Sequence, residues 1–251
     1  MTTAYERILD KLEGVKRNGN KANARWPAHP DRNTSLSLRA IEGSVLLWCF
    51  VCEDNDKVLA ALKSTSADLY DNRRGATYQY EDGRNVHRTH VNGTKDFPQT
   101  GNTSGQPTLY RLSKVKEAVK RGDAILLVEG DKDVHALESI GVTATTAPMG
   151  AGNIDKCDLS PLNGGLVTAI VDKPKDDNDT TGEQWARHLR RALTDKANIE
   201  FKQAKVGKDA ADHIAAQFGV EDFVPYVFPV NPLLAGKRNA VWLKQQRFDP
   251  L

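Results

Sequence analysis

The second half of the chain alternates between two patterns of hydrophobic and polar residues. Short apolar runs are typical of buried strands, and hydrophobic residues three or four positions apart are typical of amphipathic helices. The runs predict strands at 124–129, 142–147, 165–172 and 198–204, and the spaced patterns predict helices at 112–121, 131–140, 181–196 and 210–218. This alternation predicts an α/β fold, a mostly parallel sheet flanked by helices on both faces.

The N-terminal region carries a helical pattern followed by a hairpin pattern. Thr3 and Glu6 have the spacing of a capping box, and hydrophobic residues continue at helical spacing from Tyr5 to Val15. These residues predict an amphipathic helix at the start of the chain. Farther on, two alternating runs joined by a Glu-Gly-Ser turn predict a β-hairpin at 35–50.

These patterns divide the chain into four parts. Residues 1–72 form a compact module that holds the hairpin and one or two short helices. Residues 73–108 form a short β-rich connector, because alternating residues flank an Asp-Gly and an Asn-Gly turn signal. Residues 109–225 hold the α/β domain, and the basic tail 226–251 has no predicted structure.

Composition narrows the class of protein. With 39% hydrophobic and 27% charged residues, the chain resembles an ordinary globular protein. No apolar run approaches the roughly 18 to 20 residues needed to cross a bilayer, so we expect a cytoplasmic protein with no membrane partner. The net charge of +2 means that any surface for nucleic acid must arise from local charge segregation. Three cysteines, two of them in "CFVC", argue against a disulfide scaffold and leave metal binding open.

Carboxylates follow the predicted strands. Glu129 ends one strand and Asp172 ends another, and further aspartates follow in the next loops: Asp176, Asp177, Asp179, Asp209 and Asp212. In an open α/β sheet, ligands bind beyond the carboxyl ends of the strands, so these side chains are expected to converge. Clustered carboxylates are stabilised by a cation such as Mg²⁺ or Mn²⁺, which serves phosphoryl chemistry. The alternative is that the aspartates only cap helices and shape loops.

The motifs around these carboxylates resemble the Toprim domain, most closely the form found in phage and prophage primases. "LLVEGDKDV" matches its first motif through Glu129, Gly130 and Asp133, and "ATTAPMGAGN" is similar to its glycine loop. "DNDTTGEQWARHL" matches the Asp-x-Asp motif through Asp177, Asp179 and Gly182. "VGKDAADHIAAQFGVEDFV" resembles the third acidic segment and points to Asp209 and Asp212. The resemblance covers about residues 109–225.

The second motif departs from the family pattern. The family places the first aspartate of the pair directly at the strand end, whereas Asp172 holds that place here and "KPKD" separates it from Asp177. Two alignments follow. Either Asp172 is the strand-end ligand, which geometry slightly favours, or Asp177 and Asp179 are the pair on an extended loop.

The resemblance implies a metal-dependent nucleotidyltransferase, a DNA primase that makes short primers on single-stranded DNA from nucleoside triphosphates. The ligands of Mg²⁺ or Mn²⁺ would come from Glu129, Asp172, Asp177, Asp179, Asp209 and Asp212. Glu129 would act as general base or as a metal ligand. The implied nucleotide-binding residues are Gly130 and Asp133, and the basic helix "RLSKVKEAVKR" adds Lys114 and Lys116 for phosphate contacts.

The segment from Ala24 to Leu62 resembles the zinc-ribbon module at the N-terminus of the same primases. His29, Cys49 and Cys52 match three of its ligands in type and spacing, whereas Trp26 stands where the first cysteine belongs. A structural zinc site is closed by four ligands, so Zn²⁺ would need water or a remote residue such as His87. Alternatively, the module has lost its metal and the tryptophan packs over the hairpin.

The chain lacks the G-x-x-x-x-G-K-[ST] pattern of a helicase, so DNA unwinding would need a separate helicase partner.

Two other functions stay open. A Toprim nuclease would use the same ions to cut DNA. A non-catalytic nucleic-acid-binding replication protein would keep the fold without turnover.

Overall fold

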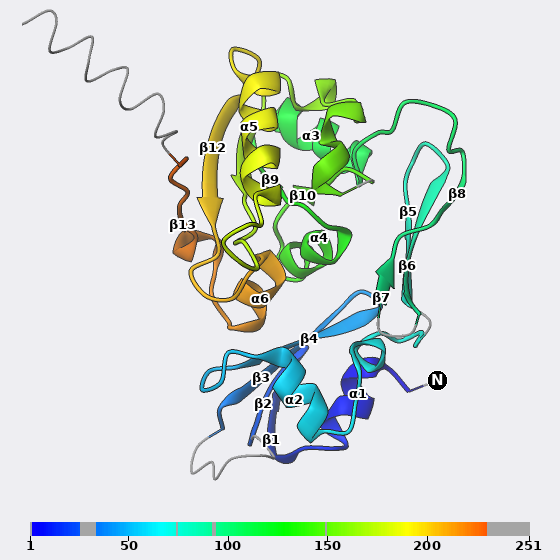
Figure 1. Cartoon of the computed structure of the whole chain (residues 1–251), viewed down its shortest axis with the longest axis vertical. Helices are drawn as coiled ribbons and strands as arrows, with labels where there is room; N and C mark the ends of the chain where they lie inside the picture. Colours follow the sequence, from blue (N-terminus) through cyan, green and yellow to red (C-terminus); the bar gives the residue numbers. More distant parts are fainter. Residues whose placement is uncertain (1, 26–33, 74, 92–93, 149, 230–251) are drawn as a thin grey trace, which may run out of the picture.

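The computed structural model describes residues 2–25, 34–73, 75–91, 94–148 and 150–229. These residues build three sheets, one in each of the predicted structured parts (Figure 1). Within the described residues, no helix is long and apolar enough to cross a membrane.

The N-terminal module is a four-stranded antiparallel sheet of order β1-β2-β3-β4 with helices packed on it. Its elements are α1 (Ala4–Leu9), β1 (Glu13–Asn18), β2 (Lys21–Arg25), β3 (Leu36–Ile41), β4 (Ser44–Cys49), α2 (Asn55–Ala61) and a 3₁₀ turn, η1 (Ser66–Leu69). The hairpin predicted at 35–50 is confirmed as β3 and β4.

The N-terminal helix is shorter than predicted. It ends at Leu9, and Val15 lies in β1 instead of on the helix. A two-residue turn of Gly19 and Asn20, with Gly19 at a φ of 59°, joins β1 to β2. Turn chemistry and strand pairing therefore outweigh the helical spacing of the hydrophobic residues.

The connector forms the second antiparallel sheet. It contains β5 (Gly75–Gln79), β6 (Arg84–Val91), β7 (Thr94–Asp96) and β8 (Gln99–Gly101), with β5, β7 and β8 all paired to β6. The predicted small antiparallel sheet is confirmed. The Asn92-Gly93 turn signal lies outside the described residues.

The third sheet has the order β10-β9-β11-β12-β13, and its pairs are parallel except for the last. Its strands are β9 (Ala124–Leu127), β10 (Ala144–Thr145), β11 (Leu166–Ile170), β12 (Asn198–Gln203) and β13 (Val224–Pro225). Its helices are α3 (Leu112–Arg121), α4 (Asp131–Glu138), α5 (Thr181–Leu193) and α6 (Ala210–Ala215), with 3₁₀ turns η2 (Ala151–Lys156), η3 (Ser160–Leu162) and η4 (Val220–Asp222). The predicted α/β fold is confirmed.

Successive residues of the central strands point to opposite layers of helices. Ile125 and Leu127 pack in one core with α3 and α5. Leu126 and Val128 pack in another core with α4 and α6. Both faces of the sheet are therefore covered, which explains why β9 is a continuous apolar run.

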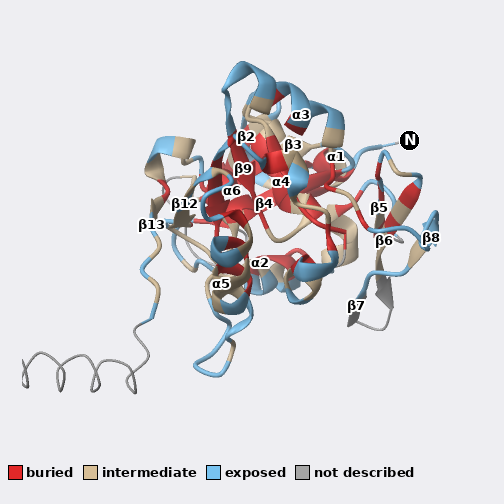
Figure 2. Ribbon diagram, turned by 90° about the horizontal axis from the view of Figure 1, so that it is seen from above, coloured by how far each residue is buried: buried red, intermediate tan, exposed pale blue. Residues whose placement is uncertain are grey.

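The N-terminal module packs directly on the α/β domain. Trp48 of β4 is 3% exposed and joins the core formed with α4 and α6, whereas Cys49 faces α1 and α2. Ser37 Oγ also donates a 2.7 Å hydrogen bond to the carbonyl oxygen of Ala215 in α6. Figure 2 shows the buried residues gathered where β4, α4, α6 and β9 meet. The Trp48 indole is therefore a core side chain, and it points to the opposite face of β4 from Cys49, as alternation along a strand requires.

Candidate active site

The carboxyl ends of β9 and β11 bring Glu129 and Asp172 together. These strands are parallel neighbours with Leu127 opposite Ala169, and each carboxylate lies two residues beyond its strand. The backbone N–H of Asp172 donates a 3.0 Å hydrogen bond to Glu129 Oε1. The predicted convergence of strand-end carboxylates therefore occurs for this pair.

Gly182, in the first turn of α5, presses against the same pair. A Cβ atom at this position would lie 2.6 Å from the carbonyl oxygen of Asp172 and 3.1 Å from Glu129 Oε1. Only glycine lets the start of α5 approach the strand end this closely. The glycine of the predicted second motif thus has a steric role at the site.

Burial makes both carboxyl groups weak acids. Desolvation is the main cause of the raised pKa of Glu129, about 7. The hydrogen bond from the Asp172 N–H and the charge of Lys208 lower this pKa, but by less. Desolvation, then repulsion from Asp133 and Glu129, raises the pKa of Asp172 to about 10. A buried acid pair of this kind is a candidate functional site, because its negative charge is poorly compensated.

We expect Asp172→Asn to weaken the dependence of stability on pH. The folded pKa of Asp172 is about 10 and an unfolded aspartate titrates near 3.9. The folded state therefore binds more protons between these values, and stability falls as pH rises, by at most about 1.4 kcal/mol per pH unit. Asparagine cannot ionise, so urea unfolding in EDTA between pH 7 and about 8.5 should show a smaller slope for the variant. Equal slopes for the two proteins would contradict this assignment.

The loop after Asp172 places one aspartate of the Asp-x-Asp motif at the site. Asp179 lines a cavity of about 330 Å³ together with Glu129, Asp172 and Lys208. Its carboxylate accepts hydrogen bonds from the N–H groups of Lys175 and Thr181, at 3.0 and 3.2 Å. These bonds lower the pKa of Asp179 to about 2.

Asp177 is exposed and does not line this cavity, whereas the neighbouring Asp176 does. The structure thus gathers Asp172 and Asp179 around Glu129 and leaves Asp177 outside. This arrangement favours the alignment in which Asp172 is the strand-end residue.

The third acidic segment forms the start of α6. Asp209 caps this helix by accepting a 2.8 Å hydrogen bond from the Asp212 N–H, and it also pairs with Lys132 Nζ at 3.0 Å. Asp133 accepts a 2.9 Å hydrogen bond from the Ala211 N–H and therefore ties α4 to α6. Burial, then repulsion from Asp209, raises the pKa of Asp133 to about 7.

Two of the remaining predicted residues also have structural contacts here. Asp212 Oδ2 accepts a 2.9 Å hydrogen bond from the Lys208 N–H. Gly130 is the N-cap of α4, and a Cβ atom there would lie 3.0 Å from Asp133 Oδ2. The helix-capping reading therefore accounts for part of the acidic segment, next to the site formed by Glu129.

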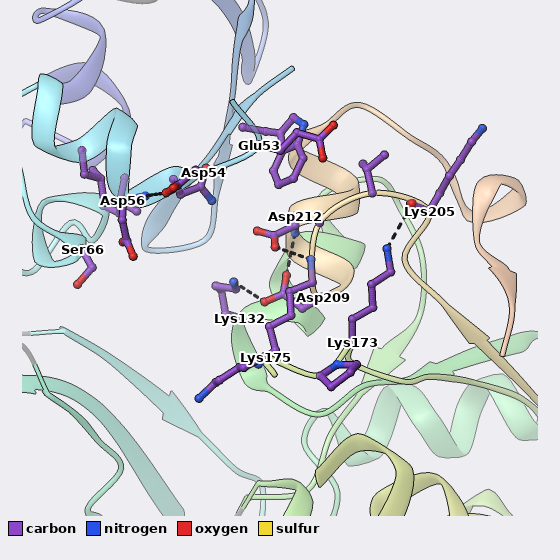
Figure 3. A pocket seen from close by; sticks show the side chains of 18 of the residues that line it. Glu53, Asp54, Asp56, Ser66, Lys132, Lys173, Lys175, Lys205, Asp209 and Asp212 are labelled. Atoms are coloured by element: carbon purple, nitrogen blue, oxygen red, sulfur yellow. Dashed lines mark hydrogen bonds and ion pairs between the residues drawn. The ribbon is translucent and has the colours of Figure 1, made fainter. Parts of the chain in front are cut away.

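A cleft of about 900 Å³ separates the N-terminal module from the α/β domain beside these residues. Figure 3 shows lysines and aspartates of the α/β domain on one side and acidic residues of the module, Asp54 and Asp56, on the other. The lysines that line the cleft are Lys132, Lys173, Lys175, Lys205 and Lys208. Positive side chains at a strand end are suited to phosphate groups.

Sequence reasoning missed these lysines and pointed to α3 instead. Lys114 pairs with Glu138 at 2.5 Å, and Lys116 is exposed, so neither lines the cavities beside Glu129. The missed signal was position: Lys173 and Lys175 follow the strand-end Asp172, and Lys208 precedes Asp209.

A second acidic group lies apart from this site. Among the described residues, Glu42, His135 and Glu138 are the one set with three ligand atoms within 4.8 Å of one another. Arg111 Nη2 donates to both glutamates, at 2.7 and 3.0 Å, and lies 3.3 Å from His135 Nε2. The Arg111 guanidinium therefore already supplies the positive charge that balances the two glutamates. These contacts join the β3–β4 turn to α4 and to the start of α3.

The zinc prediction concerns residues that the structure describes only in part. Trp26 and His29 lie outside the described residues. Burial is the main cause that raises the pKa of the Cys52 thiol, which also hydrogen-bonds Cys49. Both ring nitrogens of His87 bond threonines of the connector sheet, at 2.9 and 2.7 Å, so His87 is not a fourth zinc ligand.

The carboxylates around Glu129 fit a hard divalent cation by their chemistry. Glu129, Asp172 and Asp179 offer only oxygen donors, and all three line one cavity. Burial is the main cause that raises the pKa of Glu129 and of Asp172, and a bound cation would offset the negative charge of the pair. These three residues are therefore the candidate ligands of Mg²⁺ or Mn²⁺.

Comparisons with known proteins find similarity in structure alone. No model of a protein family matches the sequence, and no curated protein matches it. The DnaG catalytic core is 20% identical over 67% of this chain and 56% of its own, with a TM-score of 0.40. A DNA primase domain from Pseudomonas aeruginosa is 14% identical over 94% of this chain and 62% of its own, with a TM-score of 0.42. The RNA polymerase domain of Mycobacterium tuberculosis DnaG is 18% identical over 70% of this chain and 72% of its own, with a TM-score of 0.38.

These structural neighbours are primase domains. The chain spans about half the length of the first of them.

Proposed function

We propose that this protein is a metal-dependent DNA primase that condenses nucleoside triphosphates into short primers on single-stranded DNA. The observation that carries the proposal is the half-buried pair of Glu129 and Asp172 at the carboxyl edge of a parallel sheet, where the Asp172 backbone N–H donates a hydrogen bond to the Glu129 carboxylate. This is the place where open α/β sheets bind ligands. The choice of primer synthesis rests on the Toprim-like motifs and on the hairpin module that precedes them.

The proposed reaction joins a 3′-hydroxyl to the α-phosphate of a nucleoside triphosphate. A new P–O bond forms, the bond between the α-phosphate and the β-phosphate breaks, and pyrophosphate leaves. Glu129 accepts the hydroxyl proton at Oε2, since Oε1 already accepts the Asp172 N–H. A pKa of about 7 suits this role, because the group is partly ionised at neutral pH and binds a proton readily.

Divalent cations, when bound, would neutralise the triphosphate and polarise its α-phosphate. Asp172 and Asp179 would hold them, which leaves Glu129 Oε2 free to accept the proton. Gly182 keeps the start of α5 close, so that the two strand-end carboxylates stay in position. The proposed partner for unwinding the DNA is a helicase.

Lys208 is the lysine best placed to contact the triphosphate. It lines both the cleft and the smaller cavity, as do Lys173 and Lys175, and of these three it is the one whose charge lowers the pKa of both Glu129 and Asp172. Lys132 and Lys205 pair with Asp209 and Asp222. By contrast, no carboxylate in the described part of the chain pairs with the Lys208 ammonium group, which leaves that group available to a phosphate.

We therefore expect Lys208→Ala to raise the KM for nucleoside triphosphate by roughly 10- to 100-fold, the loss of one charged hydrogen bond. Steady-state incorporation at varied nucleotide concentration measures it. The matched control is Lys116→Ala, which removes an exposed lysine from α3 and should leave KM unchanged. If the two variants have equal KM values, Lys208 does not bind the triphosphate.

Product analysis tests the proposed function. The purified protein is incubated with single-stranded DNA, labelled nucleotides and Mg²⁺ or Mn²⁺, and the products are separated by length. Short labelled oligomers support primer synthesis. Shortened template would indicate a nuclease, and metal binding and DNA binding without either product would indicate a non-catalytic replication protein.

A further inference from the structure

A second cavity of about 340 Å³ opens on another side of Glu129. Its walls come from the connector sheet, from the start of α4 and from the loop that contains Pro148 and Gly150. Because Glu129 also lines the cavity of Asp172 and Lys208, the two cavities lie next to each other at this residue. A ligand that reacts at Glu129 can therefore extend into the second cavity.

Aromatic side chains and one arginine line this cavity on the connector side. Phe97 is 46% exposed, and Tyr78 is buried at the back of the site. The Arg88 guanidinium lies 5.5 Å from the ring centre of Phe97 and 5.5 Å from that of Tyr70. Arg88 Nε is buried without a hydrogen-bond partner among the described residues. An aromatic face and a stacked guanidinium are the features with which proteins hold a planar base.

Most polar side chains of the cavity wall already have hydrogen-bond partners within the protein. Gln99 accepts a hydrogen bond from Arg84 at 2.5 Å and donates one to the Pro148 carbonyl oxygen at 3.1 Å. Asp131 accepts a 2.7 Å hydrogen bond from the Tyr80 hydroxyl. Few donors or acceptors are left to read the edge of a base, so stacking dominates, and stacking tolerates any base.

We propose that this cavity holds the base and ribose of the nucleotide whose α-phosphate lies at Glu129, with the base stacked on Phe97 beside Arg88. This inference rests on the proposed function and adds the nucleoside subsite to it. A volume of about 340 Å³ lies at the lower end of ligand pockets, which suits one nucleoside. Because few free hydrogen-bonding groups remain to recognise the edge of a base, we expect purine and pyrimidine nucleotides to bind with similar affinity.

Equilibrium binding of ATP, CTP and inorganic tripolyphosphate, each with Mg²⁺, tests the subsite without any turnover. We expect Phe97→Ala to bind ATP and CTP about 5- to 150-fold more weakly, the loss of one base–aromatic stack. Tripolyphosphate has no base, so its binding should not change. The matched control is Phe50→Ala. It removes a phenylalanine of similar exposure, 47%, from the N-terminal module, away from this cavity.

Three results would overturn the subsite: unchanged ATP binding by Phe97→Ala, wild-type binding of ATP no tighter than that of tripolyphosphate, or no binding of either. The melting temperatures of both variants are measured to check that they are folded. Tight ATP binding that depends on Phe97, combined with no primer synthesis, would support the subsite and reject the proposed function. The two failures are thus distinguishable.

Discussion

The Glu129→Gln protein is expected to incorporate nucleotides about 10²- to 10⁴-fold more slowly than the wild type, the range lost with a general base. Glutamine matches glutamate in shape and can still accept the Asp172 N–H at Oε1. It cannot accept a proton at the other atom, and it offers no charge to a divalent ion. The fold should persist, because the substitution removes a buried acid whose ionisation desolvation opposes. Rates of labelled nucleotide incorporation at saturating nucleotide measure the effect.

The matched control is Asp177→Asn. It removes a carboxylate of the same loop region, but Asp177 is exposed and lies outside the cavity. We expect this variant to keep its rate within about threefold of the wild type, since exposed changes away from a site have small effects. A large loss with Asp177→Asn and none with Glu129→Gln would reverse the assignment of the site.

Gly182→Ala is expected to abolish most incorporation and to lower the free energy of unfolding by about 1–3 kcal/mol, the usual cost of overpacking. The new Cβ would lie 2.6 Å from the carbonyl oxygen of Asp172, so the start of α5 or the strand end must move. In an open helical position the same change would be stabilising. Urea unfolding and the incorporation rate, measured on the same preparation, test both parts.

Gly152→Ala is the control for this steric effect. A Cβ atom at Gly152 would meet nothing within 4 Å, and the residue lies in an exposed 3₁₀ turn. Its stability should stay within about 0.5 kcal/mol of the wild type. If Gly182→Ala behaves like Gly152→Ala, the close approach of α5 is not required at the site.

The strand-end carboxylates could be predicted because a simple rule governs them. β9 is a continuous apolar run, β11 is apolar except for Thr168, and parallel strands end at the same edge of a sheet. Glu129 and Asp172 therefore had to lie near one another once the strands were recognised. The 35–50 hairpin was also predictable, since its turn and alternation agree.

Other features depend on contacts that spacing does not encode. The choice between Asp177 and Asp179 depends on how the loop folds back, through the hydrogen bonds of Asp179 to Lys175 and Thr181. The role of Lys208 arises because α6 packs beside the end of β11. Charge density along the sequence pointed to α3, whose Lys114 pairs with α4 instead.

The N-terminal helix shows a competition between local signals. Residues up to Val15 keep helical spacing, but Gly14 has a φ of 62°, a value that favours glycine and breaks a helix. The turn of Gly19 and Asn20 then pairs β1 with β2. Long-range pairing of β2 with β3 adds further backbone hydrogen bonds, so the sheet prevails over the longer helix.

Release of pyrophosphate tests most directly whether the site of Glu129 and Asp172 transfers nucleotides. Nucleoside triphosphates, Mg²⁺ or Mn²⁺ and single-stranded DNA are mixed with the wild type or with Glu129→Gln, and pyrophosphate is followed over time. We expect release by the wild type that requires both DNA and metal, one pyrophosphate for each phosphodiester bond formed, and release by the variant at least 10²-fold slower. Equal release by the two proteins, or cleavage of the DNA without pyrophosphate, would contradict it.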